Sequence, residues 1–531
     1  MSILDVFLLM LTCSQWKRRK SPRKKLRQEK RKLAKGNTIL YQKKAGSIAC
    51  LFLLLLSPVF ASNPIWKFDP QLQKAYQSVL NLETDKAYAA LAALNTNTNP
   101  YHKIYVESFC ETLDVLISED EVKFQNIEAN FRTRFKYLDS QKESAETLFL
   151  KAELNLQRGF NFLNLGQDLN AVWAIRSAYS NAEECLKKYP DFIPVKKTSG
   201  VIQVMIGTVP DKYNWFMTLL GMKGSVTKGQ QQLQELRNSE SSLNTEATIL
   251  YFTIKGLINQ QHEEATNGIL KVLEEQPYNR LTLFLGVNML MKNSQSEKAL
   301  QLIRTLDEHP QGLPMYYIDY LRGEILLQKG DYTNSISAYK KFIAHYKSIN
   351  FKKDSYYKIA LCYWLQNKKE EAYKNFETAK KTGKEVAEPD RYANSQLKES
   401  IFPNPKILKV RLYTDGGYYQ EALATLKTID ENSLATEKEK AEYSYRKARL
   451  SDKMGDQTTA KIYYARTIKL AGVNPWYFAP NSALQLGFIS KTNNDIASAR
   501  KYFELALSYK NHAYKNSIDG KAKSALDQLK D

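Results

Sequence analysis

The sequence has little cysteine and histidine, the residues from which disulfide frameworks and most zinc sites are built. Its five cysteines are far apart in 531 residues, and no Cys-x-x-Cys pair occurs. The five histidines show no HExxH pattern or other metal-ligand spacing. We therefore expect no disulfide framework, no metal site and no bound cofactor. Cys362 falls within a helical pattern and is predicted to be a small core residue.

The common catalytic motifs are also missing. No Gly-x-Ser-x-Gly elbow and no dinucleotide-binding fingerprint is present. The segment from Gly221 to Gly229 lacks the Gly-Lys-Ser/Thr ending and the preceding strand of a phosphate-binding loop, so it is interpreted as a glycine turn between packed helices. Carboxylate pairs such as Glu370-Glu371 lie beside lysines on predicted helices, where a solvated face is expected. The sequence thus predicts no catalytic residues; an enzyme with an unrecognised site is the alternative.

Signals for β-structure are scarce. The chain has 22 glycines and 16 prolines, and few Val- or Ile-rich alternating runs. Hydrophobic residues make up 43% and there are 33 tyrosines, enough apolar surface to fold and to pack helix against helix. A chain of 531 residues is too long for one ordinary hydrophobic core, but it is a normal length for a solenoid or for two helical domains. We predict an all-α protein with almost no strand.

The formal charge of +21 is concentrated in the leader. Residues 1–61 contain 14 Lys and Arg and 2 acidic residues, which leaves an excess of +9 spread over the other 470 residues. No predicted helix carries a dense basic face with interleaved aromatics. We therefore predict no nucleic-acid partner.

A repeated hairpin organises the second half of the chain, and the stretch from Tyr356 to Ala379 shows it best. Two helical patterns there are joined by a polar break at Asn367-Lys368. A small residue of the second helix recurs at intervals of 34, 36, 37, 50, 38 and 39 residues. These small residues are Ala265, Ala299, Ser335, Ala372, Ala422, Ala460 and Ala499.

Two further positions keep register with this series. Four residues after each small site stands a large apolar or aromatic residue: Ile269, Ile303, Tyr339, Phe376, Leu426, Tyr464 or Phe503. Twelve residues before it stands a mostly small one: Thr253, Val287, Gly323, Ala360, Val410, Ala448 or Gly487. Small residues facing each other, with a bulky residue one turn on, favour close helix crossing. Turn residues such as Gly330-Asp331 and Gly455-Asp456 precede the second helix.

This array resembles the tetratricopeptide repeat family, whose unit is a helix–turn–helix of about 34 residues. The 50-residue interval contains an insertion, roughly 381–405. The resemblance implies an all-α, helical-repeat, right-handed α-solenoid over residues 243–531. The stretch from Ile518 to Leu529 is predicted to be a cap helix at its open end. The alternative is a generic helical bundle with chance periodicity.

Residues 62–236 are predicted to be a divergent N-terminal helical region. Gln71–Leu94 has the spacing of one hairpin, and Ala145–Tyr189 that of two longer helices that turn at Gly166. Residues 195–236 resemble a eukaryotic tetratricopeptide family linked to clearance of inclusion bodies and to lipid handling, in which a proline, an apolar helix, a Gly-x-x-Gly turn and a further glycine occur in this order. The polar, serine-rich segment Arg237–Glu246 is predicted to be the boundary.

Residues 1–61 have the order of a secretory leader. Lys43-Lys44 precede a short apolar run and Ala61 occupies the cleavage position, which predicts export to the periplasm or the outside. The alternative is a membrane anchor formed by residues 45–61. The long basic preface suggests that translation starts near Ile39 or Leu40; its rival is a true basic tail at a membrane.

In the tetratricopeptide family the first helices line the concave side, and this implies a ligand groove in the present chain. The residues placed there by register are Tyr317, Tyr320, Glu324, Tyr357, Trp364, Tyr445 and Arg449. Tyr and Trp give rigid contact area for a protein or peptide; the alternative is that these rings pack between repeats. We predict a non-enzymatic, exported scaffold that binds a protein or peptide. A membrane-tethered assembly or lipid-handling factor is the second hypothesis.

Overall fold

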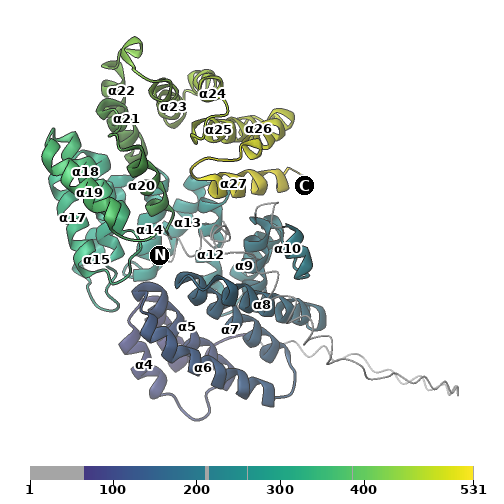
Figure 1. Cartoon of the computed structure of the whole chain (residues 1–531). Helices are drawn as coiled ribbons and strands as arrows, with labels where there is room; N and C mark the ends of the chain where they lie inside the picture. Colours follow the sequence, from purple (N-terminus) through teal and green to yellow (C-terminus); the bar gives the residue numbers. More distant parts are fainter. Residues whose placement is uncertain (1–64, 210–213, 260, 386, 530–531) are drawn as a thin grey trace, which may run out of the picture.

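The protein is an all-α molecule. A computed structural model describes residues 65–209, 214–259, 261–385 and 387–529, and within these ranges every regular element is a helix (Figure 1). Successive helices pair as hairpins that follow one another along a curved path. The predicted all-α helical-repeat class is confirmed. The predicted leader, its cleavage near Ala61 and the possible anchor at 45–61 lie outside the described residues; none of the described helices is long and apolar enough to cross a membrane.

The N-terminal region is helical throughout the described residues, and it contains the predicted hairpin at Gln71–Leu94 and the two predicted helices at Ala145–Tyr189. Its helices are α3 (Pro70–Leu80), α4 (Thr84–Ala92), α5 (Pro100–Ser118), α6 (Glu121–Ser140), α7 (Ala145–Asn164), α8 (Asp168–Lys188), α9 (Val195–Gly207), α10 (Asn214–Leu219) and α11 (Val226–Arg237). Gly166 turns the chain between α7 and α8 with φ +72. Gly200 and Gly229 let α9 and α11 cross closely, because a Cβ on Gly229 would lie 2.5 Å from the carbonyl oxygen of Gly200. Of the interpreted glycine turn, Gly221 has φ +71 after α10, whereas Gly229 lies inside α11 and serves helix packing.

The C-terminal array follows directly. Its hairpins are α12 (Asn244–Leu257) with α13 (His262–Glu275), α14 (Arg280–Lys292) with α15 (Ser296–Glu308), α16 (Tyr317–Lys329) with α17 (Tyr332–His345), α18 (Lys352–Leu365) with α19 (Lys369–Lys381), α21 (Pro405–Gly416) with α22 (Tyr419–Lys427), α23 (Glu437–Lys453) with α24 (Gln457–Ala471), and α25 (Phe478–Thr492) with α26 (Ile496–Ser508). Two helices stand outside this pairing: α20 (Glu388–Glu399) in the predicted insertion and α27 (Lys515–Asp527) at the end. A short 3₁₀ turn, Glu431–Ser433, precedes α23.

Each hairpin is closed by its small residue. All seven members of the series from Ala265 to Ala499 are fully buried. Where the opposing position is glycine, the bulky residue fills the space: a Cβ on Gly323 would lie 2.9 Å from the Tyr339 ring, and one on Gly487 2.5 Å from the Phe503 ring. The predicted register of small and large residues is thereby confirmed.

Aspartate caps and glycine turns set the hairpin angle. Gly330, at φ +88, ends α16, and the Asp331 side chain then accepts the backbone N–H of Asn334 at the start of α17. Gly455 and Asp456 repeat this arrangement between α23 and α24. A residue without a Cβ adopts positive φ without strain, and an aspartate satisfies an otherwise unpaired N–H of the first turn.

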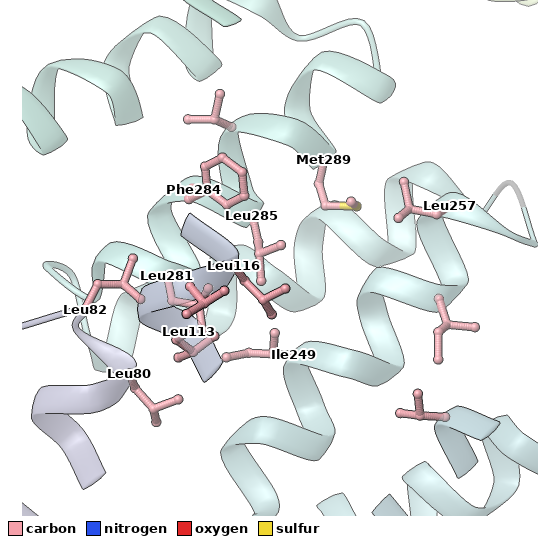
Figure 2. Packing of buried hydrophobic residues seen from close by; sticks show 14 of the residues in the cluster. Leu80, Leu82, Leu113, Leu116, Ile249, Leu257, Leu281, Phe284, Leu285 and Met289 are labelled. Carbon is pink, nitrogen blue, oxygen red and sulfur yellow. The ribbon is translucent and has the colours of Figure 1, made fainter. Parts of the chain in front are cut away.

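One hydrophobic core runs across the predicted boundary between residues 236 and 243. Figure 2 shows Leu113 and Leu116 of α5 beside Ile249 of α12 and Leu281 of α14. The serine-rich segment is part of this junction, because the backbone N–H of Ser242 donates to the carbonyl oxygen of Trp66 over 2.9 Å. The N-terminal region and the array thus share buried surface, and the segment that connects them has Ser241 and Leu243 buried and Glu240 exposed.

The insertion changes how the hairpins stack. Helix α20 packs on α18, and the following α21 packs on α16, two hairpins earlier in the chain. A Cβ on Gly417, at the α21–α22 turn, would lie 1.9 Å from the carbonyl oxygen of Ser294, after α14. The regular stacking of successive hairpins is therefore interrupted at this point. Helix α20 packs on α18, and the next hairpin, α21–α22, packs on α16.

The last helix, predicted as a cap over Ile518–Leu529, packs on the final hairpin α25–α26. It also contacts α11 in the first half of the molecule, so the end of the array is not open. Ser524 donates to Asn259 after α12 over 3.0 Å, and Ser225 at the start of α11 donates to Asp527 over 2.9 Å. Polar residues of α27 make these contacts, among them Lys523, which donates to the carbonyl oxygen of Val209 over 2.6 Å.

Candidate binding surface on the first helices of the hairpins

The predicted tyrosines of α16 form an aromatic cluster with Phe351. The Tyr317 and Tyr320 rings stack with centroids 5.1 Å apart, and both contact the Phe351 ring, at 4.8 and 5.1 Å. Tyr320 is 4% exposed, whereas Tyr317 is half-buried. Tyr320 therefore belongs to the core between α16 and α18, and Tyr317 packs against it while remaining partly exposed.

Glu324 is engaged in a polar network beneath this cluster. It accepts hydrogen bonds from the Tyr339 hydroxyl and from the ammonium group of Lys358. The Tyr320 hydroxyl donates to Asp354 over 2.7 Å. Burial raises the pKa of Asp354 against the opposing effect of Lys358. Glu324 is thus already paired, and its carboxylate positions Lys358 and Tyr339.

The aromatics predicted on α18 are covered by neighbouring elements. Tyr357 is 2% exposed and meets Phe376 of α19 edge to face. Trp364 stacks on Phe402, with centroids 4.7 Å apart and an interplanar angle of 12°, and its Nε1 donates to the carbonyl oxygen of Pro403 over 3.1 Å. Phe402 and Pro403 come from the insertion. Tyr357 and Trp364 therefore pack against neighbouring elements, as the alternative interpretation proposed.

On α23 the two predicted residues differ. Tyr445 is 2% exposed, its ring lies against Tyr464 and Phe478, and its hydroxyl accepts from Asn481 over 2.8 Å. Arg449, one turn later, is half-buried and makes no hydrogen bond or ion pair with any residue that the structure describes. Burial lowers the pKa of Arg449, but Tyr464 and nearby acidic groups outweigh it and hold the pKa above its usual value. Among the predicted groove residues Arg449 thus has its charged group free.

Two arginines of the same side were not predicted. Arg411 of α21 donates to the Tyr392 hydroxyl over 3.0 Å, and Arg446 of α23 donates to the Tyr477 hydroxyl over 2.6 Å. Tyr392 lies on α20 and stacks with Tyr514, which precedes α27. No periodic signal could connect Arg411 with Tyr392 and Tyr514, because the insertion and the last helix lie outside the repeat register.

The described residues supply binding groups. They contain no group of three or more His, Cys, Asp or Glu side chains that could hold a metal ion. Cys110, Cys185 and Cys362 are buried free thiols, and burial raises the pKa of each to about 12. The prediction that Cys362 is a core residue is confirmed. Charged, amide and aromatic side chains on the first helices remain as the functional groups of this surface.

Comparison with known proteins identifies the repeat. The family model described as tetratricopeptide repeat matches residues 320–344 and 353–381, which lie in the hairpins α16–α17 and α18–α19. This supports assignment of the array to the tetratricopeptide superfamily. No curated protein matches the chain.

Solved structures with related helix arrangements are distant. The human IFIT1 dimer with PPP-AAAA is 14% identical, with 83% of this chain and 95% of that chain covered and a TM-score of 0.30. Aspartyl phosphate phosphatase F from Bacillus subtilis is 12% identical, with 76% and 93% covered and a TM-score of 0.19. The pentatricopeptide repeat protein PPR10 from maize is 11% identical, with 83% and 74% covered and a TM-score of 0.19. At these values we draw no functional conclusion from them.

Proposed function

We propose that this protein is a non-enzymatic scaffold that binds a protein or peptide on the first helices of its hairpins. The observation that carries the proposal is the tetratricopeptide match at 320–344 and 353–381 within a longer array of the same construction. Such arrays present an extended curved surface to which each repeat contributes one helix face. Arg449 and the amides of Asn481 and Gln485 supply polar groups on α23 and α25.

A photo-crosslinking experiment tests this function. A photoreactive amino acid replaces Gln485, half-buried on the first helix α25, in the full chain. The matched control replaces Ile462, which is 61% exposed on the second helix α24. We expect a defined protein adduct from position 485 and none from position 462. Adducts of equal yield at both positions, or none at position 485, would contradict the proposal.

We further propose that the scaffold works in the cell envelope or outside, after removal of residues 1–61. The support is the order of basic residues, apolar run and Ala61 in the sequence. N-terminal sequencing of the mature protein should give Ser62 as the first residue. Retention of residues 45–61 together with membrane fractionation would favour the tethered alternative, an assembly or lipid-handling factor, to which the resemblance of residues 195–236 also points.

A further inference from the structure

Helices that are far apart in the sequence meet where the chain closes on itself. The hydrogen bond from Ser524 to Asn259 places α27 over the start of α13. The close contact of Gly417 with Ser294 places the α21–α22 turn at the end of α14, and α23 packs on α21. The ends of α13 and α14 are thereby brought together with α23 and α27.

Four cationic side chains converge at this junction. They are Lys292 of α14, Arg449 and Lys453 of α23, and Lys521 of α27, and we call them the basic interior cluster. None of the four makes a hydrogen bond or ion pair with a residue in the described part of the chain, and Arg449, Lys453 and Lys521 are half-buried. Cations taken partly out of water are normally paired, because desolvation without a partner is costly.

The four groups are near enough to act on one another. Burial and the charges of Lys292 and Arg449 lower the pKa of Lys521 to about 7. Burial and Arg449 lower the pKa of Lys453 to about 8. Burial and the same cations lower the pKa of His262 at the start of α13. Burial and neighbouring cations thus destabilise the charged forms of Lys453 and Lys521.

Three carboxylates lie within electrostatic range of the cluster. Asp452 accepts the Tyr464 hydroxyl over 2.9 Å, and Asp415 lies 3.7 Å from the guanidinium of Arg411. Glu388 at the start of α20 raises the pKa of Lys521. Asp452 and Asp415 make no hydrogen bond or ion pair with any of the four cations within the described residues.

The outer groove between α15, α16 and α17 shows the contrasting case. It has a volume of about 630 Å³ and several basic residues. Arg322 pairs with Asp307 over 2.8 Å, Lys329 with Glu297 over 2.8 Å, and Lys341 with Asp319 over 3.1 Å. Three of its cations are thus compensated within the protein, which distinguishes it from the basic interior cluster.

We propose that the basic interior cluster binds an acidic segment of the protein or peptide partner, through carboxylates that pair with Lys292, Arg449, Lys453 and Lys521. This inference rests on the proposed scaffold function. Unpaired, partly desolvated cations at the meeting point of four helices favour an anionic ligand through charge complementarity. A single-stranded nucleic acid would also be anionic, but its bases need exposed aromatic faces. Of the rings that interact with Arg449, Tyr445 and Tyr464 are at most 2% exposed and Tyr419 is half-buried.

Fluorescence anisotropy with the full mature chain tests the proposal. The probe is a labelled octapeptide of alternating Glu and Ser, and the comparison peptide carries Gln in place of Glu. We expect the Glu peptide alone to bind, and Arg449→Gln or Lys521→Gln each to weaken it about tenfold. Lys292→Gln, at an exposed position, gives the same test without a change in buried residues. Lys469→Gln, an exposed lysine on α24, is the matched control and should leave binding unchanged.

Three outcomes would overturn the inference. These are equal affinity of both peptides, equal affinity of the Lys292 and Lys469 variants, and binding of an eight-nucleotide single strand in place of the Glu peptide. A partner crosslinked at position 485 combined with any of them would leave the scaffold function standing and remove only the acidic-ligand inference. Absence of both the crosslink and the peptide complex would remove both.

Discussion

At the residue scale, the ammonium group of Lys197 is the centre of a buried charge network. It lies 2.8 Å from Glu153 and 3.2 Å from Glu246, and the three side chains are at most 6% exposed. The Tyr105 hydroxyl and Thr198 Oγ1 complete the network as donors to Glu246 and Glu153. These residues belong to α5, α7, α9 and α12, so the network joins the N-terminal region to the array.

Replacement of Lys197 by Met should cost about 3–5 kcal/mol in the free energy of unfolding, because two buried carboxylates lose their shared cation. Lys67→Met is the matched control, since Lys67 forms an exposed pair with Glu240 at 55% and 72% side-chain exposure and should change stability by at most about 1 kcal/mol. Urea denaturation measures both. Equal stability of the two variants would show that the buried network contributes nothing specific.

Asp390 provides a test by pH. Its carboxylate accepts the backbone N–H groups of Phe351 and Asp354 over 2.7 and 2.9 Å, yet burial raises its pKa from 3.8 to about 7. Between these values the folded state holds a proton that the unfolded state has lost. Stability from this group is therefore greatest below about pH 4 and falls as the pH rises toward 7, by up to about 1.4 kcal/mol per pH unit.

The unfolding free energy of the wild type minus that of Asp390→Asn should consequently decrease from pH 4 to pH 7. Denaturant titrations across this range measure it. Asp85→Asn, an exposed change on α4, gives the reference slope. If this signed difference stays constant or increases with pH, Asp390 is ionised throughout the range.

At the element scale, the insertion acts through α20 and the segment that follows it. Phe402 is 7% exposed and contacts Trp364, Tyr373 and Phe376. It therefore seals the surface of α18 and α19 that the next hairpin would cover in an uninterrupted array. The insertion replaces a missing hairpin contact with an aromatic one.

Phe402→Ala should lower the free energy of unfolding by about 3–5 kcal/mol, because a buried aromatic side chain is removed and a cavity is left beside Trp364. The preceding residue gives the control: Ile401 is 75% exposed, and Ile401→Ala should stay within about 0.5 kcal/mol of the wild type. Thermal denaturation followed by circular dichroism measures both. Similar losses in the two variants would mean that the insertion does not pack on α18.

The hairpins themselves followed from the sequence, since the series from Ala265 to Ala499 reports a contact made within each hairpin. The positions of the predicted groove residues could not be derived in the same way. An aromatic residue at the register of Tyr357 fits the core and a binding face equally well. Trp364 is covered by Phe402, which belongs to an insertion without periodicity, so this packing could not be predicted from the repeat. Arg449 makes no hydrogen bond or ion pair within the described residues, and nothing in the repeat register could have shown this in advance.

At the scale of the whole molecule, the shared core decides which parts fold alone. Leu281, Phe284 and Leu285 of α14 lie in the same cluster as Leu80 and Leu113 of the N-terminal region (Figure 2). The boundary was predicted because the segment is polar and rich in serine. In the structure Ser241 and Ser242 instead form hydrogen bonds with the backbone of Trp66 and Phe68. Sequence alone could not show this, since the partners are about 175 positions apart.

Residues 243–531 produced without the N-terminal region should therefore fail to form a stable fold, because α12 and α14 would expose their apolar contacts with α3 and α5. Limited proteolysis and the cooperativity of thermal unfolding measure this. Residues 62–531 serve as the control and should resist proteolysis. A cooperative transition of the shorter fragment at the temperature of the control would contradict the prediction.

The return of α27 to α11 has a consequence for how the protein comes apart. In an open array of repeats, stability is a sum of nearest-neighbour terms and the ends fray first. Here the bonds of Ser225 and Asn259 to α27 span about 300 and 265 positions, so the terminal helix is held by residues from the other half of the chain. Amide hydrogens of α27 should then exchange at the rate of those in α11 and α12, and loss of the final helix should coincide with opening of the whole molecule.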